Sequence, residues 1–279
     1  MYKGYRDVVP IDSHHRRDEA IDMDLELAGK RFIVGGASRG IGRAIATLLV
    51  AEGAHVLLTS RNVNPLVPVA DSLGERARPF TADLSVAEDI DGLVEQSRET
   101  FQDGIDGIVV NHGGPDPGAA LDLTDSQWQH AFALVVGGPI RLLRGLQPQL
   151  REESSVVWVT SSSTRIALPN LDTSNVLRPA VAGLTKTLAA QLAPRTRVNS
   201  VAPGRIDTAR VRSLDEEQAS ATGRDYVDQR RLMEKAIPLG RYGQPEEFAR
   251  VAAFLLSPVA SYLTGAAIQV DGGSVRALP

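Results

Sequence analysis

The stretch GGASRGIG, residues 35–42, lies between a short apolar run, RFIVGG, and a segment with helical apolar spacing, RAIATLLVAEG. Such a glycine turn lets the backbone approach a pyrophosphate closely and aims a helix N-terminus at its negative charge. Because the turn stands between a predicted strand and a predicted helix, it indicates a dinucleotide-binding site. The residues predicted to line the site in this turn are Gly36, Ser38, Arg39, Gly40, Ile41 and Gly42.

The end of the second predicted strand, AHVLLTS, bears on which dinucleotide is bound. A chain that selects NAD usually places an acid there to hold the ribose 2′-hydroxyl. Here the strand ends in Thr59-Ser60-Arg61, and Arg39 stands inside the glycine turn. Guanidinium groups match phosphate oxygens, so Ser60, Arg61 and Arg39 predict a 2′-phosphate and therefore NADP(H). The alternative is a pair of solvated arginines near a loop.

Strand-like and helix-like segments alternate along the rest of the chain. This alternation predicts one Rossmann-type, doubly wound α/β domain over residues 26–279, with a parallel sheet of about seven strands and helices on both faces. Such a sheet binds ligands beyond the carboxyl ends of its strands, where the strand order reverses. Residues 204–238 are charged and lack a core pattern, which makes them a candidate substrate lid over that edge.

Composition excludes several classes of function. The chain has 279 residues, a net charge of -4 and no cysteine, which argues against a nucleic-acid partner, disulfides and thiolate metal sites. No apolar run approaches the roughly 20 residues of a membrane helix, and we expect no membrane association, no metal site and a cytoplasmic location. Residues 1–25 are highly charged and are predicted to form an arm outside the core, either a flexible tail or a segment packed on a neighbouring subunit.

Several motifs together make the sequence, from about Leu25 to Val275, resemble the short-chain dehydrogenase/reductase family. They are the glycine turn, Asp83-Leu84, the stretch NHGG at residues 111–114, PGRIDT at residues 203–208, and VDGG near the end. The segments SNVLRPAVAGLTKTLA and PGRIDTARV suggest a branch similar to 3-oxoacyl-[acyl-carrier-protein] reductases. The resemblance implies an oxidoreductase fold that assembles as a homo-oligomer, a dimer or tetramer. The further cofactor-binding residues that it implies are Asp83, Leu84, Asn111, Gly113, Arg178, Pro203, Gly204, Ile206 and Thr208.

The family's catalytic tetrad is the point where this sequence departs from the pattern. A gap-free alignment on AVAGLTKTLA puts Ser174 at the position of the tyrosine and Arg178 at that of the lysine, while Ser161 keeps the serine and Val135 replaces the asparagine. A serine hydroxyl is a far weaker acid than a phenol. Arginine can donate hydrogen bonds to ribose hydroxyls but stays protonated. Pro179 further predicts that the helix begins near this position, since proline is tolerated in a first turn.

Other groups at the same edge are candidates for the missing proton donor. His112 has a suitable intrinsic pKa, although a structural histidine in the turn explains it as well. Tyr226 lies in the predicted lid. Ser161 and the two serines after it can offer hydroxyls to a substrate oxygen, or simply cap the strand. The candidate catalytic residues are therefore Ser161, Ser174, Arg178 and His112.

Three functions remain open on this sequence. The first is an NADP(H)-dependent oxidoreductase that reduces a carbonyl or an activated double bond of a small molecule with an unorthodox proton donor, since the cofactor itself carries the hydride chemistry. The second is a non-redox isomerase, dehydratase or cyclase in the same pocket. The third is a catalytically silent NADP(H)-binding subunit or sensor, because a fold shared with enzymes does not fix function.

Overall fold

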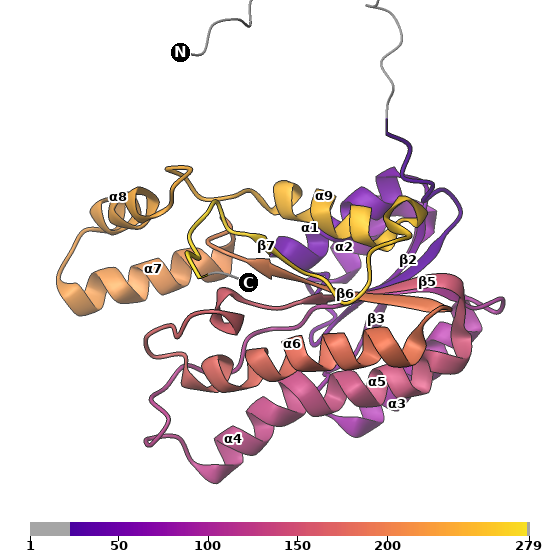
Figure 1. Ribbon diagram of the computed structural model, residues 1–279, viewed down its shortest axis with the longest axis horizontal. Coiled ribbons are helices and arrows are strands. Elements are labelled where there is room, and N and C mark those ends of the chain that lie inside the picture. Colours follow the sequence, from indigo (N-terminus) through magenta and orange to yellow (C-terminus); the bar gives the residue numbers. More distant parts are fainter. Residues whose placement is uncertain (1–22, 278–279) are drawn as a thin grey trace, which may run out of the picture.

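Seven parallel strands form the centre of the computed structural model, which describes residues 23–277 (Figure 1). Their order across the sheet is β3-β2-β1-β4-β5-β6-β7, so the direction of winding reverses between β1 and β4. The predicted doubly wound parallel sheet is confirmed, including the number of strands. Most of the predicted arm, residues 1–22, lies outside the described part of the chain. The strands are β1 Arg31–Gly35, β2 His55–Ser60, β3 Ala77–Thr81, β4 Ile105–Val110, β5 Leu150–Val159, β6 Thr196–Pro203 and β7 Ala267–Val270.

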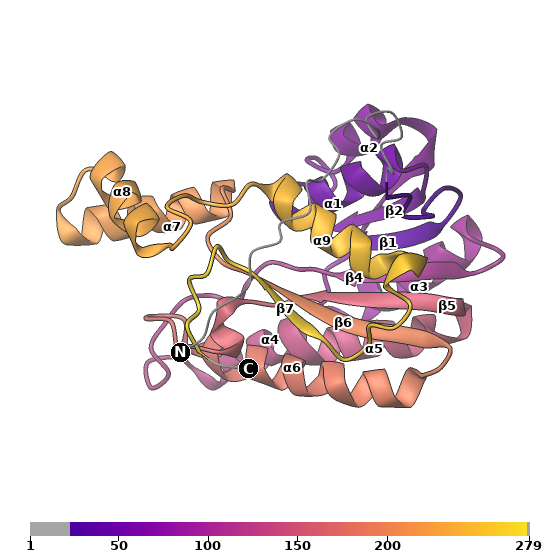
Figure 2. The same cartoon turned by 45° about the horizontal axis from the view of Figure 1, so that its top comes forward.

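Helices cover both faces of the sheet. In Figures 1 and 2, α1, α2 and α9 lie on one face and α3 to α6 on the other. Each face has its own apolar core, one around Leu49 and Phe248 and one around Leu134 and Trp158. Within residues 23–277, no helix has the length and apolar character needed to cross a bilayer. The helices are α1 Gly40–Ala51, α2 Val67–Leu73, α3 Ala87–Thr100, α4 Asp125–Phe132, α5 Gly138–Leu146, α6 Asp172–Leu192, α7 Ala209–Thr222, α8 Tyr226–Ala236 and α9 Pro245–Leu256.

A π-helical turn, Ala133–Gly137, separates α4 from α5 where the sequence predicts one long helix interrupted by glycine and proline. Val135, in the middle of this turn, is fully buried in the core. Gly138 begins α5 so close to the strand-end loop that a Cβ there would stand 1.6 Å from the carbonyl oxygen of Leu84. The π-helical turn therefore lets α5 begin against the loop that follows β3, and the residue in the middle of the turn, Val135, carries no polar side chain.

Helix α6 corrects the prediction that this helix begins near Pro179. It begins at Asp172 and continues through Pro179. Its first turn is held by tertiary contacts, because the Asp172 carboxylate accepts from the Ala120 N–H at 2.9 Å. The Asn175 amide also exchanges two hydrogen bonds with the backbone of Leu168, at 2.9 and 2.8 Å. These contacts outweigh the loss of the one N–H that proline cannot donate.

The predicted lid segment, residues 204–238, contains α7 and α8, which project beyond the carboxyl edge of the sheet (Figures 1 and 2). Asp215 on α7 is fully buried, forms an ion pair with Arg205 and accepts from the Tyr242 hydroxyl at 2.7 Å. Asp207, which precedes α7, pairs with Arg230 of α8 at 2.9 Å. Buried and half-buried ion pairs thus hold both helices to the strand-end loops.

Candidate active site

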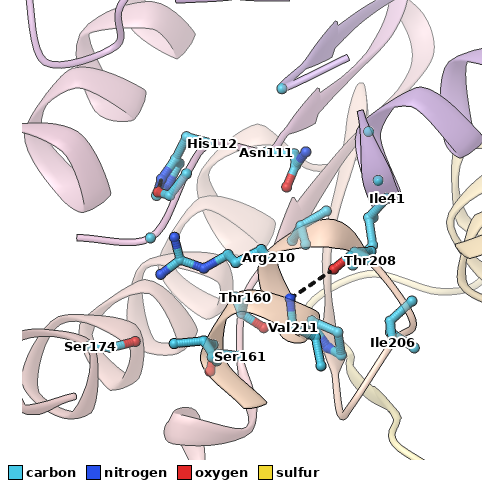
Figure 3. A pocket seen from close by; sticks show the side chains of 18 of the residues that line it. Ile41, Asn111, His112, Thr160, Ser161, Ser174, Ile206, Thr208, Arg210 and Val211 are labelled. Atoms are coloured by element: carbon cyan, nitrogen blue, oxygen red, sulfur yellow. Dashed lines mark hydrogen bonds between the residues drawn. The ribbon is translucent and has the colours of Figure 1, made fainter. Parts of the chain in front are cut away.

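A cavity of about 710 Å³ opens at the carboxyl ends of the strands, where the winding reverses. The loops after β1, β2, β4, β5 and β6 and the start of α7 form its walls, and Figure 3 shows part of it. All four candidate catalytic residues line this cavity, as does every predicted cofactor-binding residue except Asp83. Within residues 23–277, no group of three histidine, cysteine, aspartate or glutamate side chains could hold a metal ion.

The glycine turn is packed so tightly that three of its glycines, Gly35, Gly36 and Gly42, have no room for side chains. Gly36 has a φ of +61°, and a Cβ at Gly42 would stand 2.3 Å from the Gly36 carbonyl oxygen. The Asn111 side chain braces the turn by donating to the carbonyl of Gly35 at 3.0 Å. Helix α1 then begins without a side-chain cap, since Arg39 at the N-cap makes no capping bond. The backbone N–H groups at this helix start therefore border the cavity without a side-chain cap.

The second predicted part of the cofactor site, at the end of β2, contains arginine and no acid. Arg39 and Arg61 both line the cavity, and neither forms an ion pair within the described part of the chain. Among residues 23–277, no aspartate or glutamate lines the cavity. Asp83 stands outside it, because its carboxylate accepts from the backbone N–H and the hydroxyl of Ser85 at 2.8 and 2.7 Å. Asp83 is thus the one predicted cofactor-binding residue that does not line the cavity.

Ser161, at the end of β5, has a structural contact and also faces the cavity. Its Oγ accepts from the Ser163 N–H at 3.1 Å and caps a short 3₁₀ turn. Ser163 in turn shares a hydrogen bond with the Ser174 hydroxyl at 3.1 Å. Figure 3 shows Ser161 and Ser174 on neighbouring elements along the same wall. Ser161 therefore caps the strand end and also faces the cavity, which are the two alternatives that the sequence left open.

Ser174 and Arg178 stand one turn apart on the buried face of α6. The Arg178 side chain is only 6% exposed, and its Nη1 donates to the carbonyl of Val159 at 2.9 Å. Its Nε is buried without a partner in the described part of the chain. Burial, together with the positive charge of Arg210, lowers the pKa of Arg178 to about 10, so the guanidinium remains charged at neutral pH.

His112 follows Asn111 at the end of β4. Its Nδ1 lies 2.7 Å from the carbonyl oxygen of Gly113, and because that oxygen can only accept, Nδ1 carries the proton. Burial, and then the positive charge of Arg178, lower the pKa of His112 to about 3. The ring is therefore neutral at pH 7. Tyr226, the other proton-donor candidate, lies outside the cavity wall and hydrogen-bonds to Arg230.

Arg210 is a residue of the cavity wall that the sequence analysis does not single out. It follows Thr208, the N-cap of α7, whose Oγ1 accepts from the Val211 N–H at 3.4 Å (Figure 3). A Cβ on Gly114 would stand 2.7 Å from Arg210 Nη2, so the guanidinium rests against this glycine. The sequence feature that could have identified Arg210 is its position in the first turn of a helix, where the helix dipole favours acidic side chains.

Comparisons with known proteins identify the family to which the chain is similar. The family model described as enoyl-(acyl carrier protein) reductase matches residues 36–275. An uncharacterised oxidoreductase of Mycobacterium tuberculosis is 35% identical, over 91% of this chain and 94% of that protein. Human dehydrogenase/reductase SDR family member 4 is 34% identical, over 89% and 88%. The L-sorbose reductase of Gluconobacter frateurii, solved with NADPH and L-sorbose, superposes with a TM-score of 0.87 at 32% identity, covering 92% of this chain and all of that one, 100%.

Proposed function

The chain belongs to the short-chain dehydrogenase/reductase family, and from this premise we propose that it is an NADP(H)-dependent oxidoreductase that reduces a carbonyl or an activated double bond. The proposal places it in a branch similar to 3-oxoacyl-[acyl-carrier-protein] reductases, with an active site that works without a tyrosine–lysine pair. Helices α7 and α8 are the proposed lid of this site.

One observation carries the proposal: a tightly packed glycine turn opens into a cavity that is lined by Arg39 and Arg61 and, within the described part of the chain, by no acid. The backbone N–H groups at the start of α1 fit a pyrophosphate. The two guanidinium groups fit a 2′-phosphate, whereas an NAD-selective site would place a carboxylate at the end of β2. The NADPH bound by the structurally similar L-sorbose reductase supports this choice of cofactor.

The bound cofactor supplies a hydride, and the residues of this chain orient the substrate. In the proposal, the Ser161 hydroxyl donates to the substrate oxygen, since it donates to no described residue. Arg178, fixed by its bond to the Val159 carbonyl, adds positive charge beside the reacting groups. Preorganised donors of this kind favour the negative charge that develops on oxygen or on an enolate as hydride is added.

Water or the substrate itself supplies the proton in this proposal. No tyrosine or lysine occurs among the residues that line the cavity in the described part of the chain. His112 is neutral, with its one N–H bonded to Gly113. Ser174 has no adjacent base to make it an effective proton donor, because its hydroxyl is bonded to another serine.

The test follows NADPH absorbance with a panel of ketones, quinones and α,β-unsaturated acyl compounds. We expect NADPH oxidation with at least one of these classes, and tighter binding of NADPH than of NADH. Tight NADPH binding without oxidation by any class would contradict the oxidoreductase assignment and favour a silent subunit or sensor. A reaction that proceeds equally fast without cofactor would favour the non-redox alternative.

Two serine variants test the proton-transfer half of the proposal. Ser161→Ala is expected to lower kcat by about 100-fold, because it removes a donor to the developing charge. Ser174→Ala is expected to change kcat by less than about tenfold, because a serine hydroxyl without a base transfers protons poorly. A loss with Ser174→Ala as large as that with Ser161→Ala would contradict a solvent- or substrate-derived proton.

A further inference from the structure

A bound dinucleotide would balance only part of the positive charge that lines the cavity. Of the arginines that line it, only Arg205 has a carboxylate partner in the described part of the chain, the buried Asp215. The others form no ion pair within residues 23–277, and no acid stands in the cavity wall to balance them. The arginines of the wall are Arg39, Arg61, Arg178, Arg205 and Arg210.

The four unpaired arginines belong to two places along the sheet edge. Arg39 and Arg61 follow β1 and β2, where the glycine turn and the proposed phosphate contacts lie. Arg178 is bonded to Val159, the last residue of β5, and Arg210 follows β6. Two strand spacings separate β1 from β5, which is about 10 Å. The second pair is therefore attached to the chain further along the edge than the glycine turn, although the Arg61 guanidinium reaches Gly113 and that of Arg210 reaches the next residue, Gly114.

Arg178 differs from the other strongly buried arginine of this protein, Arg197. The guanidinium of Arg197, at the opposite end of the strands, donates to the carbonyls of Ser257 and Leu263. Arg178 is equally buried, but among residues 23–277 it bonds only to the Val159 carbonyl, and its Nε has no partner there. A buried charge without an acid or a set of carbonyls around it is unusual in a finished core. Its position in the cavity wall points to a ligand as the missing partner.

Arg210 brings a second positive charge to the same place. It lies close enough to Arg178 to lower the pKa of that residue, so the two cations repel each other in the absence of an anion. Arg210 also stands in the first turn of α7, where the helix dipole opposes a cation. In Figure 3 its guanidinium extends from α7 into the space between His112 and Ser174. Both repulsions would be relieved by a bound anion.

We propose that Arg178 and Arg210 form a carboxylate-binding subsite, so that the substrate is a small carboxylic acid bearing its reactive carbonyl or double bond near the carboxylate. This names the substrate class of the reductase site and rests on the proposed function. The guanidinium fork matches the two oxygens of a carboxylate. Ile166, Leu168 and Leu171 of the same cavity offer an apolar wall for the rest of a small substrate, and Ser161 offers a donor to its carbonyl oxygen.

Calorimetric titration of the protein saturated with NADP⁺ tests this subsite. The ligands are crotonate and 2-oxobutanoate, their neutral amides, and inorganic phosphate. We expect each acid to bind at least about tenfold more tightly than its amide, which is about 1.4 kcal/mol. Arg210→Ala should remove most of this difference while the affinity for NADP⁺ changes less than about threefold. Arg178→Gln should also remove most of the difference between acid and amide, and Arg210→Ala decides alone if Arg178→Gln fails to fold.

Arg231→Ala is the matched control. Arg231 lies on α8 of the same two-helix segment, and its exposed side chain pairs with Asp228 outside the cavity wall. Equal binding of acid and amide, or an equal loss with Arg231→Ala, would overturn the subsite. Phosphate binding that depends on Arg210 while the acids fail to bind, or acid binding that occurs only in protein free of NADP⁺, would overturn the carboxylate assignment. If NADP⁺ and NADPH do not bind but acids are still preferred over amides, the proposed cofactor fails and the subsite stands.

Discussion

Replacing Arg61 with alanine is expected to weaken the binding of NADPH much more than the binding of NADH, because of where Arg61 lies in the cavity wall. Arg61 lies at the end of β2, is exposed in the cavity wall, and has no ion-pair partner within residues 23–277. Its removal therefore breaks no bond in the folded protein. We expect the free energy of unfolding to change by less than about 0.5 kcal/mol, as for other exposed positions.

The expected effect on binding follows from the one bond that the variant removes. A hydrogen bond to a charged group contributes about 1.5–3 kcal/mol, so the dissociation constant for NADPH should rise roughly 10- to 150-fold. NADH lacks the 2′-phosphate, and its dissociation constant should change by less than about threefold. Arg39→Ala should act in the same direction, because Arg39 also lines the cavity and makes no capping bond.

Fluorescence or calorimetric titration with NADPH and NADH measures both constants on the same preparations. Arg76→Ala is the control for a general charge effect, because Arg76 is exposed in the turn before β3 and lies outside the cavity wall. It should leave both constants unchanged. The reasoning is refuted if Arg61→Ala weakens NADH as much as NADPH, if it leaves NADPH binding intact, or if the unaltered protein prefers NADH.

Three further outcomes are expected. Tyr242→Phe leaves the fully buried Asp215 with one donor fewer and should destabilise the protein by about 1–3 kcal/mol in denaturant unfolding, an expectation that an unchanged midpoint would contradict. Gly42→Ala places a Cβ 2.3 Å from a backbone oxygen and should abolish tight NADPH binding in titrations. Gly183→Ala adds a Cβ with nothing within 4 Å and should raise the free energy of unfolding by about 0.5–1 kcal/mol. The NMR signal of His112 should titrate near its pKa of about 3. Because the ring of the unfolded chain binds a proton below about pH 6.5, the contribution of His112 to stability is full above that pH and falls as the pH drops toward 3.

The parts of the fold that the sequence predicts are those determined by local patterns. Apolar spacing and the glycine turn at residues 35–42 specify strands, helices and the carboxyl edge where the site lies. The start of α6 could not be predicted in this way, because Pro179 signals a helix start while contacts of Asp172 and Asn175 with distant loops extend the helix. Asp83 was assigned by resemblance; its carboxylate accepts from the backbone and the hydroxyl of Ser85, and its contact with the cofactor stays a prediction.

The continuous helix through Pro179 changes how the altered residues at Ser174 and Arg178 should be understood. Had the helix begun at the proline, these two side chains would have belonged to a loop, and their order in the sequence would say little about their positions. Since α6 already includes both, they lie one turn apart on its buried face, toward the cavity. A weak hydroxyl and a permanent cation therefore occupy two positions on one helical face. A cation that cannot release a proton, held by a strand-end carbonyl and placed opposite a second arginine, is suited to holding a negative charge rather than to relaying a proton.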